Sequence, residues 1–360
     1  MAAAVPTMTG MVDTVLLAEP RGFCAGVEMA IKALTWMVRI FEPPVYCYHE
    51  IVHNASVVEA FEAAGVIFVE DIEEVPPGAP VMLSAHGSSP EVVAVASERA
   101  AVMVDAVCPL VTKVHHEVKR MAADGSDILY VGHEGHDEAV GTVAEAPASV
   151  TLVDPEQGFG GFAPRDPLRV ALVAQTTLGL HEWQGVREQA AARYPSLWTA
   201  RKRDLCYATT NRQAAVEVLA KRADVVLVVG SSNSSNTRAL VRVARAAGGT
   251  AHRIDGADAL DRSWLEGART VGVTAGASAP DQAVRAVIDA VAPRHGVEVV
   301  AVTEESEYFP PPPQLRAFLG VLQGAVEGGY GARAYGASGP LDDDRNWSAA
   351  QALDLIRSRS

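Results

Sequence analysis

Residues 223–248 read ADVVLVVGSSNSSNTRALVRVARAAG, and this stretch decides the fold. The apolar run 225–229 predicts a strand that is buried on both faces. The polar turn GSSNSSN then leads into a segment with the apolar spacing of an amphipathic helix. A buried strand, a loop and a returning helix form the repeating unit of a parallel sheet, so the stretch predicts an α/β fold.

The same order of elements recurs along the chain. Further strand–loop–helix segments, whose strands end in His, Gly, Ser or Gln, lie at 43–65, 79–100, 126–146, 169–194 and 268–291. Single cysteines open helical segments at similar intervals, at Cys24, Cys108 and Cys206. Any α/β protein contains strand–loop–helix segments, but a threefold order at one period indicates triplication. We therefore expect three similar α/β domains with small, parallel-rich sheets, arranged with pseudo-threefold symmetry around a common centre.

The repeats set the expected domain boundaries. The three α/β domains are predicted at 13–108, 109–205 and 206–300. Residues 1–12 are expected to form a disordered N-terminal segment. The region 301–360 turns acidic, then proline-rich and glycine-rich, and is expected to be a partly disordered C-terminal tail. Within it, residues 346–358 could form a short amphipathic helix, and the role of the tail stays open.

Composition narrows the class of protein. The formal net charge of −14 argues against a nucleic-acid partner, although a local pocket can still bind a small anion. No apolar run is long enough for a membrane helix, and the first residues do not resemble a secretory signal, so we expect a cytoplasmic protein. Four cysteines are too few for a disulfide framework.

The three repeat cysteines indicate a metal group. Each lies where a helix begins, and the positive end of a helix favours the thiolate form that binds iron or zinc. Structural zinc sites usually contain C-x-x-C pairs, which are absent here. Single thiolates from distant segments suit a cubane cluster, so we expect Cys24, Cys108 and Cys206 to hold one 4Fe–4S cluster with one iron left free. Cys47 lies outside the pattern and is expected to serve packing.

The loops after the strands carry hydrogen-bond donors. Candidate ligands for an anion are His53, His86, His136, Ser234, Ser235, Asn236 and Ser278. Imidazoles, hydroxyls and loop N–H groups can hold a diphosphate without Lys or Arg, although Ser and Asn also cap helices. Glu138 is the leading candidate proton donor, and Thr176 and Thr177 are available to orient a hydroxyl group.

Nine strings in the chain resemble one enzyme family. They are PRGFCAGVEMAI, HEIVHN, SAHG, DAVCPLVTKVH, GHEGHDEAVGT, QTTL, CYATTNRQ, VVGSSNSSNT and TAGASAPD. In content and order they are similar to 4-hydroxy-3-methylbut-2-enyl diphosphate reductase, also called IspH or LytB, from about residue 14 to residue 300.

The resemblance implies the last step of the methylerythritol phosphate route to isoprenoids. The family reduces (E)-4-hydroxy-3-methylbut-2-enyl diphosphate to isopentenyl and dimethylallyl diphosphate, with electrons from a ferredoxin or flavodoxin. By motif, the three repeat cysteines would bind the cluster, and the histidines, serines and asparagine named above would bind the diphosphate. Glu138 would supply the proton, His136 would lie close to the proton relay, and Thr176 would lie beside the substrate hydroxyl. We expect a monomer or a homodimer with no membrane partner.

Three departures from the family pattern stand out. Tyr48 and Ser232 replace a common Arg and a common Lys, and Ser88–Ser89 replaces Val-Ser; the loss of two basic groups could weaken substrate capture. Two alternatives remain: a non-catalytic iron–sulfur redox sensor on the same scaffold, and a zinc-stabilised sugar-phosphate binding protein. Because the chain keeps Glu138 and Thr176, the enzyme is favoured over the sensor.

Overall fold

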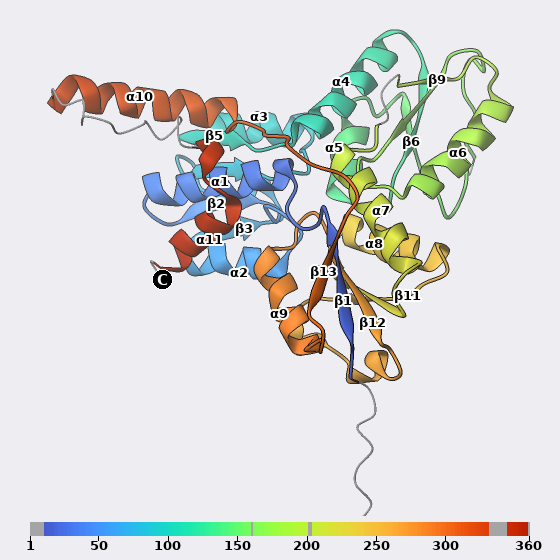
Figure 1. The fold of residues 1–360 in the computed structure, drawn as a ribbon. Coiled ribbons are helices and arrows are strands. Elements are labelled where there is room, and N and C mark those ends of the chain that lie inside the picture. Colours follow the sequence, from blue (N-terminus) through green and yellow to red (C-terminus); the bar gives the residue numbers. More distant parts are fainter. Residues whose placement is uncertain (1–10, 160, 201–203, 331–343, 359–360) are drawn as a thin grey trace, which may run out of the picture. The chain divides into compact units, whose positions relative to one another are not determined.

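The computed structural model describes residues 11–159, 161–200, 204–330 and 344–358, with backbone only for 325–330. In this part of the chain the strands form three separate sheets, and every strand pair is parallel (Figure 1). The predicted α/β fold with small parallel sheets is therefore confirmed. None of the helices described is both long and apolar enough to cross a membrane.

The chain divides into two compact units, which are described separately. The first contains Met1–Phe23, Thr177–Leu180 and Leu205–Ser306, and it holds the five-stranded sheet. The second contains Cys24–Thr176, His181–Asp204 and Glu307–Ser360, and it holds both four-stranded sheets.

The five-stranded sheet has the order β11-β10-β12-β1-β13. Its strands are β1 (Thr14–Glu19), β10 (Val225–Val229), β11 (Thr250–Ile254), β12 (Thr270–Ala275) and β13 (Val297–Ala301). Helices α7 (Tyr207–Ala220), α8 (Ser235–Ala246) and α9 (Asp281–Val291) accompany it, with the 3₁₀ turns η2 (Ala257–Ala259) and η3 (Arg262–Leu265).

Strand β10 is packed on both of its faces in this core. Its alternate side chains enter two different clusters: Leu227 packs with Val284 of α9, whereas Val228 packs in the cluster of α7 and α8 that contains Leu240. A strand covered on both faces is apolar at every position, which explains the continuous run VVLVV.

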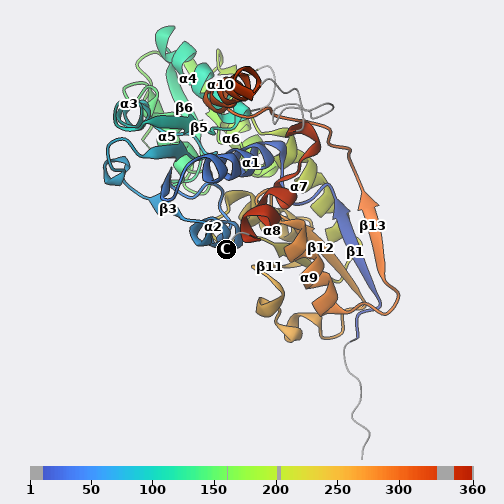
Figure 2. The ribbon, with the colours of Figure 1, turned by 90° about the vertical axis from the view of Figure 1, so that its left-hand side faces the viewer.

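Strand β1 lies in this sheet and not in that of the segment that follows it. It pairs with β12 on one side and β13 on the other (Figure 2). Val15 is in register with Val271 and Val297. The expected first domain, 13–108, assigned this strand to the wrong neighbours, because a local apolar pattern does not specify a strand's partner. Val12, expected in a disordered segment, is buried in the same core; residues 1–10 lie outside the described residues.

The second unit contains two similar four-stranded sheets. The first has the order β3-β2-β4-β5 and consists of β2 (Val45–Tyr48), β3 (Val66–Val69), β4 (Pro80–Leu83) and β5 (Val102–Asp105). Its helical segments are α1 (Ala25–Ile40), α2 (Ala55–Ala63), α3 (Pro90–Arg99) and η1 (Ile72–Glu74).

The second sheet of this unit has the order β7-β6-β8-β9. Its strands are β6 (Asp127–Val131), β7 (Val150–Val153), β8 (Val170–Ala174) and β9 (Trp198–Thr199). Its helices are α4 (Pro109–Ala123), α5 (Asp137–Ala144) and α6 (Leu180–Arg193). Asp127 anchors the start of β6 by accepting hydrogen bonds from the backbone and side chain of Arg165.

The C-terminal region is built into the second unit. It contains α10 (Pro313–Tyr330), the turn η4 (Asp344–Asn346) and α11 (Ala349–Arg357), and α11 packs on α1 and α2 (Figure 1). Lys32 of α1 forms a 2.9 Å ion pair with Asp344, and both side chains are almost completely buried. Tyr308 donates a hydrogen bond to the same carboxylate. The predicted short helix is confirmed by α11, and the described part of the tail is largely helical; residues 331–343 lie outside the described residues.

Candidate functional site

The polar side chains of the second unit gather where its strands end. His49 and His53 follow β2, and His86 follows β4. The stretch that contains His136, Asp137 and Glu138 follows β6, and Thr176 follows β8. Because the carboxyl ends of parallel strands carry the loops that bind ligands, these positions form a candidate site.

Three of the predicted diphosphate ligands form one cluster of histidines. The rings of His53 and His86 are stacked, with centroids 3.9 Å apart and planes 9° from parallel. The ring of His136 stands edge-on to both, with centroids 5.4 Å from that of His53 and 6.0 Å from that of His86. Imidazoles concentrated in this way are suited to bind an anion.

Glycines let the loops of this cluster approach closely. A Cβ atom at Gly141 of α5 would lie 3.1 Å from the carbonyl oxygen of Gly87, in the loop that carries His86. Gly87 itself has a φ of +88°, in the left-handed region that favours glycine, and a Cβ there would lie 3.1 Å from the His115 ring. A side chain at Gly141 would push α5 away from the His86 loop, and one at Gly87 would push that loop away from α4.

Glu138 is buried and held by one partner. Its Oε1 accepts a hydrogen bond from the Thr176 N–H at 2.7 Å, and its Oε2 accepts one from Thr176 Oγ1 at 2.9 Å. Burial raises the pKa of Glu138 to about 7, although both hydrogen bonds from Thr176 oppose the rise. A carboxyl group with this pKa can carry a proton and release it near neutral pH.

His136 has a defined orientation. It caps α5, where its Nδ1 accepts a hydrogen bond from the backbone N–H of Glu138 at 3.2 Å. An imidazole that accepts at Nδ1 carries its proton at Nε2, so the ring can donate from that side. Capping and ligand binding are thus compatible roles for this residue.

Two members of the cluster were missed by the sequence reasoning. The carboxylate of Asp137 accepts a 3.0 Å hydrogen bond from His49 Nδ1, and its other oxygen lies 3.7 Å from His53 Nε2 and 3.6 Å from His86 Nδ1. Burial alone would raise the pKa of Asp137, but the hydrogen bond from His49 and the charges of the histidines hold it well below the usual value. Their positions in the sequence could have identified His49 and Asp137, because both lie in the segments after strands that had already been assigned to the site.

Two of the predicted cluster ligands lie together in this unit. Cys24 and Cys108 are the N-cap residues of α1 and α4. Both sulfur atoms lie within 4 Å of the position that a Cβ on Gly26 would occupy. The two thiols therefore converge on a space kept open by a glycine, at two helix starts that favour thiolate, and this arrangement fits an iron–sulfur group.

Cys206 occupies the matching position in the first unit. It is the N-cap of α7, and its sulfur accepts a hydrogen bond from the Thr209 N–H at 3.2 Å. All four cysteines lie in the described chain, and none forms a disulfide. Cys47 differs from the other three because it is completely buried in β2, and burial raises the pKa of its thiol, so it packs in the core.

The predicted anion ligands of the first unit follow β10 and β12. Ser234 caps α8 by accepting from the Thr237 N–H, and its Oγ lies 3.4 Å from that of Ser278. Asn236 Oδ1 accepts a hydrogen bond from the Ala277 N–H at 2.9 Å, which joins the two loops. A further hydrogen bond runs from Thr177 Oγ1 to Ser235 Oγ at 3.1 Å. The structure thus brings the four predicted ligands of this unit together.

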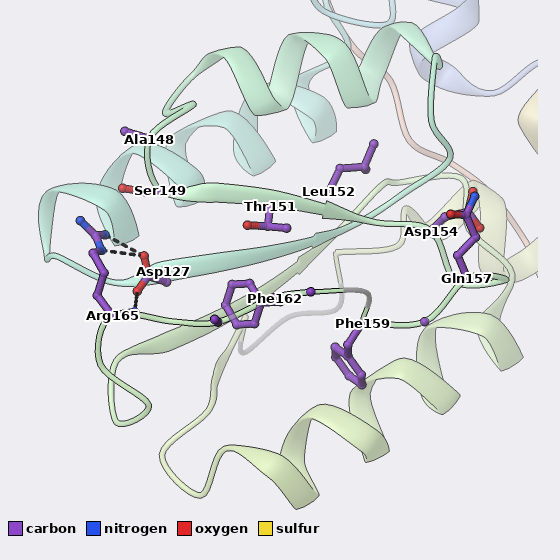
Figure 3. Close-up of a pocket in the computed structure, with 13 residues that line it drawn as sticks. Asp127, Ala148, Ser149, Thr151, Leu152, Asp154, Gln157, Phe159, Phe162 and Arg165 are labelled. Atoms are coloured by element: carbon purple, nitrogen blue, oxygen red, sulfur yellow. Dashed lines mark hydrogen bonds and ion pairs between the residues drawn. The ribbon is translucent and has the colours of Figure 1, made fainter.

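A separate hollow of about 530 Å³ lies beside the edge strand β7 (Figure 3). Thr151 and Leu152 of β7 line it together with Phe159 and Phe162, and the ion pair of Asp127 with Arg165 lies at one end. None of the predicted site residues lines it, so it is distinct from the candidate site.

Comparisons with known proteins agree on one family. The sequence model of the LytB protein family matches residues 15–292. A relative from Mycolicibacterium paratuberculosis (strain ATCC BAA-968 / K-10), named 4-hydroxy-3-methylbut-2-enyl diphosphate reductase, is 48% identical over 307 residues, which cover 84% of this chain and 92% of the relative. A relative of the same name from Phenylobacterium zucineum (strain HLK1) is 48% identical over 285 residues, which cover 79% and 91%.

Solved structures give the same result. The E-1-hydroxy-2-methyl-but-2-enyl-4-diphosphate reductase from Plasmodium falciparum superposes with a TM-score of 0.83 at 31% identity, over 87% of this chain and 99% of that one. A structure of (E)-4-hydroxy-3-methyl-but-2-enyl diphosphate reductase superposes with a TM-score of 0.55 at 30% identity, over 78% and 99%. Motifs, fold and relatives therefore agree, and the chain belongs to the LytB protein family.

Proposed function

We propose that the chain is a 4-hydroxy-3-methylbut-2-enyl diphosphate reductase that yields isopentenyl and dimethylallyl diphosphate. Relatives of that name match most of its length. The observation that carries the proposal is the buried Glu138 carboxyl, whose pKa is raised to about 7. It is hydrogen-bonded to Thr176 and lies two residues after His136 of the histidine cluster. Reductive removal of the hydroxyl group of an allylic diphosphate requires a site that binds the diphosphate and a proton donor beside it.

Cys24, Cys108 and Cys206 are the proposed ligands of one 4Fe–4S cluster. Support comes from their equivalent N-cap positions and from the space that Gly26 leaves beside the first two sulfur atoms. Such a cluster supplies electrons one at a time and, with only three protein ligands, an iron that can polarise the hydroxyl oxygen.

The protein side chains have separate roles in the proposed reaction. The histidines of the second unit and the serines and asparagine of the first bind the diphosphate: His53, His86, His136, Ser234, Ser235, Asn236 and Ser278. Thr176 orients the substrate hydroxyl, and its bond to Glu138 places the proton donor next to that oxygen. The C4–O bond breaks with two electrons and two protons: one proton joins the hydroxyl, which leaves as water, and the other joins the allylic carbon chain to give either product. Glu138 gives one proton and is reprotonated from solvent.

The proposed partners and location follow from the same family. The electrons come from a ferredoxin or a flavodoxin, the protein acts as a monomer or a homodimer, and it resides in the cytoplasm. None of these requires a membrane or a nucleic acid.

The test uses protein purified without oxygen and assayed with a reduced viologen dye as the electron source. We expect a brown protein with iron and sulfide bound, which converts the allylic diphosphate to the two isoprenyl diphosphates. A brown protein that does not turn over would support the redox sensor, and a colourless protein with stoichiometric zinc would support the sugar-phosphate binding protein.

A further inference from the structure

A carboxylate at the centre of a proposed diphosphate pocket calls for an explanation, since it has the same sign of charge as the ligand. Asp137 lies there between three histidines, at 3.0 Å from His49 Nδ1, 3.7 Å from His53 Nε2 and 3.6 Å from His86 Nδ1. Only the contact with His49 is short enough for a hydrogen bond. The second carboxylate oxygen of Asp137 therefore faces the rings of His53 and His86 without a hydrogen bond to either.

Asp137 is held in this position by His49. The backbone of His49 has a φ of 58°, a left-handed conformation that is unusual for a residue other than glycine, and its N–H bonds the Val69 carbonyl at 2.9 Å. Its ring stacks on that of Tyr48, with centroids 4.0 Å apart. The His49 ring is therefore fixed at the end of β2, and it fixes the carboxylate at the start of α5.

A cation shared by His53 and His86 does not explain the arrangement. The two rings are stacked with planes only 9° from parallel, and a metal ion lies in the plane of each imidazole that binds it. Two nearly parallel planes do not meet at one nearby ion. His86 Nδ1 is nonetheless buried without a hydrogen-bond partner, so the nearest charge available to it is the carboxylate of Asp137.

The surroundings of His86 disfavour its protonated form. Burial lowers the pKa of His86, and the charges of His53 and His136 lower it further, against the attraction of Asp137. A bound diphosphate reverses this preference, because a nearby anion favours the charged form of an imidazole. A fixed carboxylate that holds one tautomer and stabilises the imidazolium as it forms is the role that Asp has in a Ser-His-Asp triad.

We propose that Asp137 is a positioning residue, which acts as the fixed counter-ion of His53 and His86 and lets these rings take up protons from solvent when a diphosphate binds. This inference rests on the proposed function. The other charged groups in contact with the cluster are Glu50, 3.2 Å from His53, and Glu70, 3.7 Å from His49. Glu70 is largely exposed and Glu50 partly so, so that solvent screens both more than it screens Asp137.

The test measures binding of inorganic pyrophosphate to the anaerobically purified holoprotein by calorimetry. Titrations in two buffers of different ionisation enthalpy give the number of protons taken up with the ligand. The variants are Asp137→Asn, which keeps the shape and removes the charge, and His49→Asn, which releases the carboxylate and tolerates a positive φ. Glu134→Gln, an exposed residue of the same loop, is the matched control.

The expected result is weaker binding with fewer protons taken up. At pH 8 Asp137→Asn should bind pyrophosphate about tenfold more weakly than the wild type, a difference of about 1.4 kcal/mol. The loss should shrink at pH 6, because protonating an imidazole costs less free energy as the pH falls. His49→Asn should change affinity and proton uptake in the same direction, and Glu134→Gln should match the wild type.

Two results would be decisive against these ideas, and they are distinguishable. If the wild type binds pyrophosphate and Asp137→Asn binds it equally well or more tightly at both pH values, with the same proton uptake, the counter-ion role is wrong. If the wild type binds neither pyrophosphate nor the allylic diphosphate, the proposed function itself fails.

Discussion

Replacing Thr176 by valine is expected to raise the pKa of Glu138 above its value of about 7. The carboxylate accepts two hydrogen bonds from Thr176, one from the backbone N–H and one from Oγ1. Valine preserves the backbone bond and nearly the same volume, but it removes the Oγ1 donor. Because this donor favours the ionised form, its loss makes the carboxylate harder to form.

The size of the shift follows from that single bond. A hydrogen bond to a charged group contributes about 1.5–3 kcal/mol. One pKa unit corresponds to about 1.4 kcal/mol, so the pKa of Glu138 in Thr176→Val should rise by about 1 to 2 units. The carboxyl group would then stay protonated to about pH 8 to 9, because the rise is added to a starting value of about 7.

Infrared titration measures this ionisation directly, without depending on turnover. The carboxylic C=O band of Glu138 is identified by its absence from Glu138→Gln, and its loss is followed as pH rises. Thr176→Ser retains the hydroxyl donor and is the matched control, so its midpoint should remain near 7. A midpoint in Thr176→Val that is unchanged or lower would refute the inference that Oγ1 stabilises the ionised form.

Three other perturbations test the site and the fold. Turnover by the wild type should fall as pH rises through about 7, because the protonated form of Glu138 is lost, and a rate that increases across this range would contradict the assigned proton donor. Lys32→Met leaves Asp344 buried without its cation and should lower the free energy of unfolding by about 3–5 kcal/mol in a denaturant titration. A loss below about 1 kcal/mol is typical of an exposed ion pair, and it would show that the contact is not buried in solution. Gly26→Ala places a Cβ 2.8 Å from a cysteine sulfur of the proposed cluster site and should reduce the bound iron, whereas Gly185→Ala, which meets nothing within 4 Å, should retain it.

The sequence predicted the local elements well, because they follow from local patterns. The run at 225–229 forms a strand covered on both faces, and the loops that were expected to carry ligands follow strand ends. The expected α/β fold with small parallel sheets and the expected family are both confirmed. The roles of the individual site residues stay predictions, which the variants above test.

Long-range pairings could not be predicted in the same way. Nothing in residues 14–19 indicates that they pair with the strands that begin at Thr270 and Val297, since an apolar strand fits any sheet with a vacant edge. The tail was expected to be partly disordered because its composition is acidic and rich in Pro and Gly. One of its contacts is the buried ion pair of Asp344 with Lys32, which joins residues 312 apart in the chain. The hydrogen bond between Asp137 and His49 was missed for the same reason. The two residues are far apart in the sequence and meet only in the folded protein, where one follows β2 and the other follows β6.

The most direct test of the central claim compares Glu138→Gln with the wild type, both purified without oxygen and matched for bound iron and sulfide. Each is mixed with reduced viologen dye and (E)-4-hydroxy-3-methylbut-2-enyl diphosphate, and the isoprenyl diphosphates are quantified. We predict turnover by the wild type and a loss of at least about 100-fold in the variant, in line with the contribution of a general acid, at unchanged iron content. Near-normal turnover by Glu138→Gln would contradict the account of the proton donor, and an iron-loaded wild type that forms no product would contradict the proposed reaction.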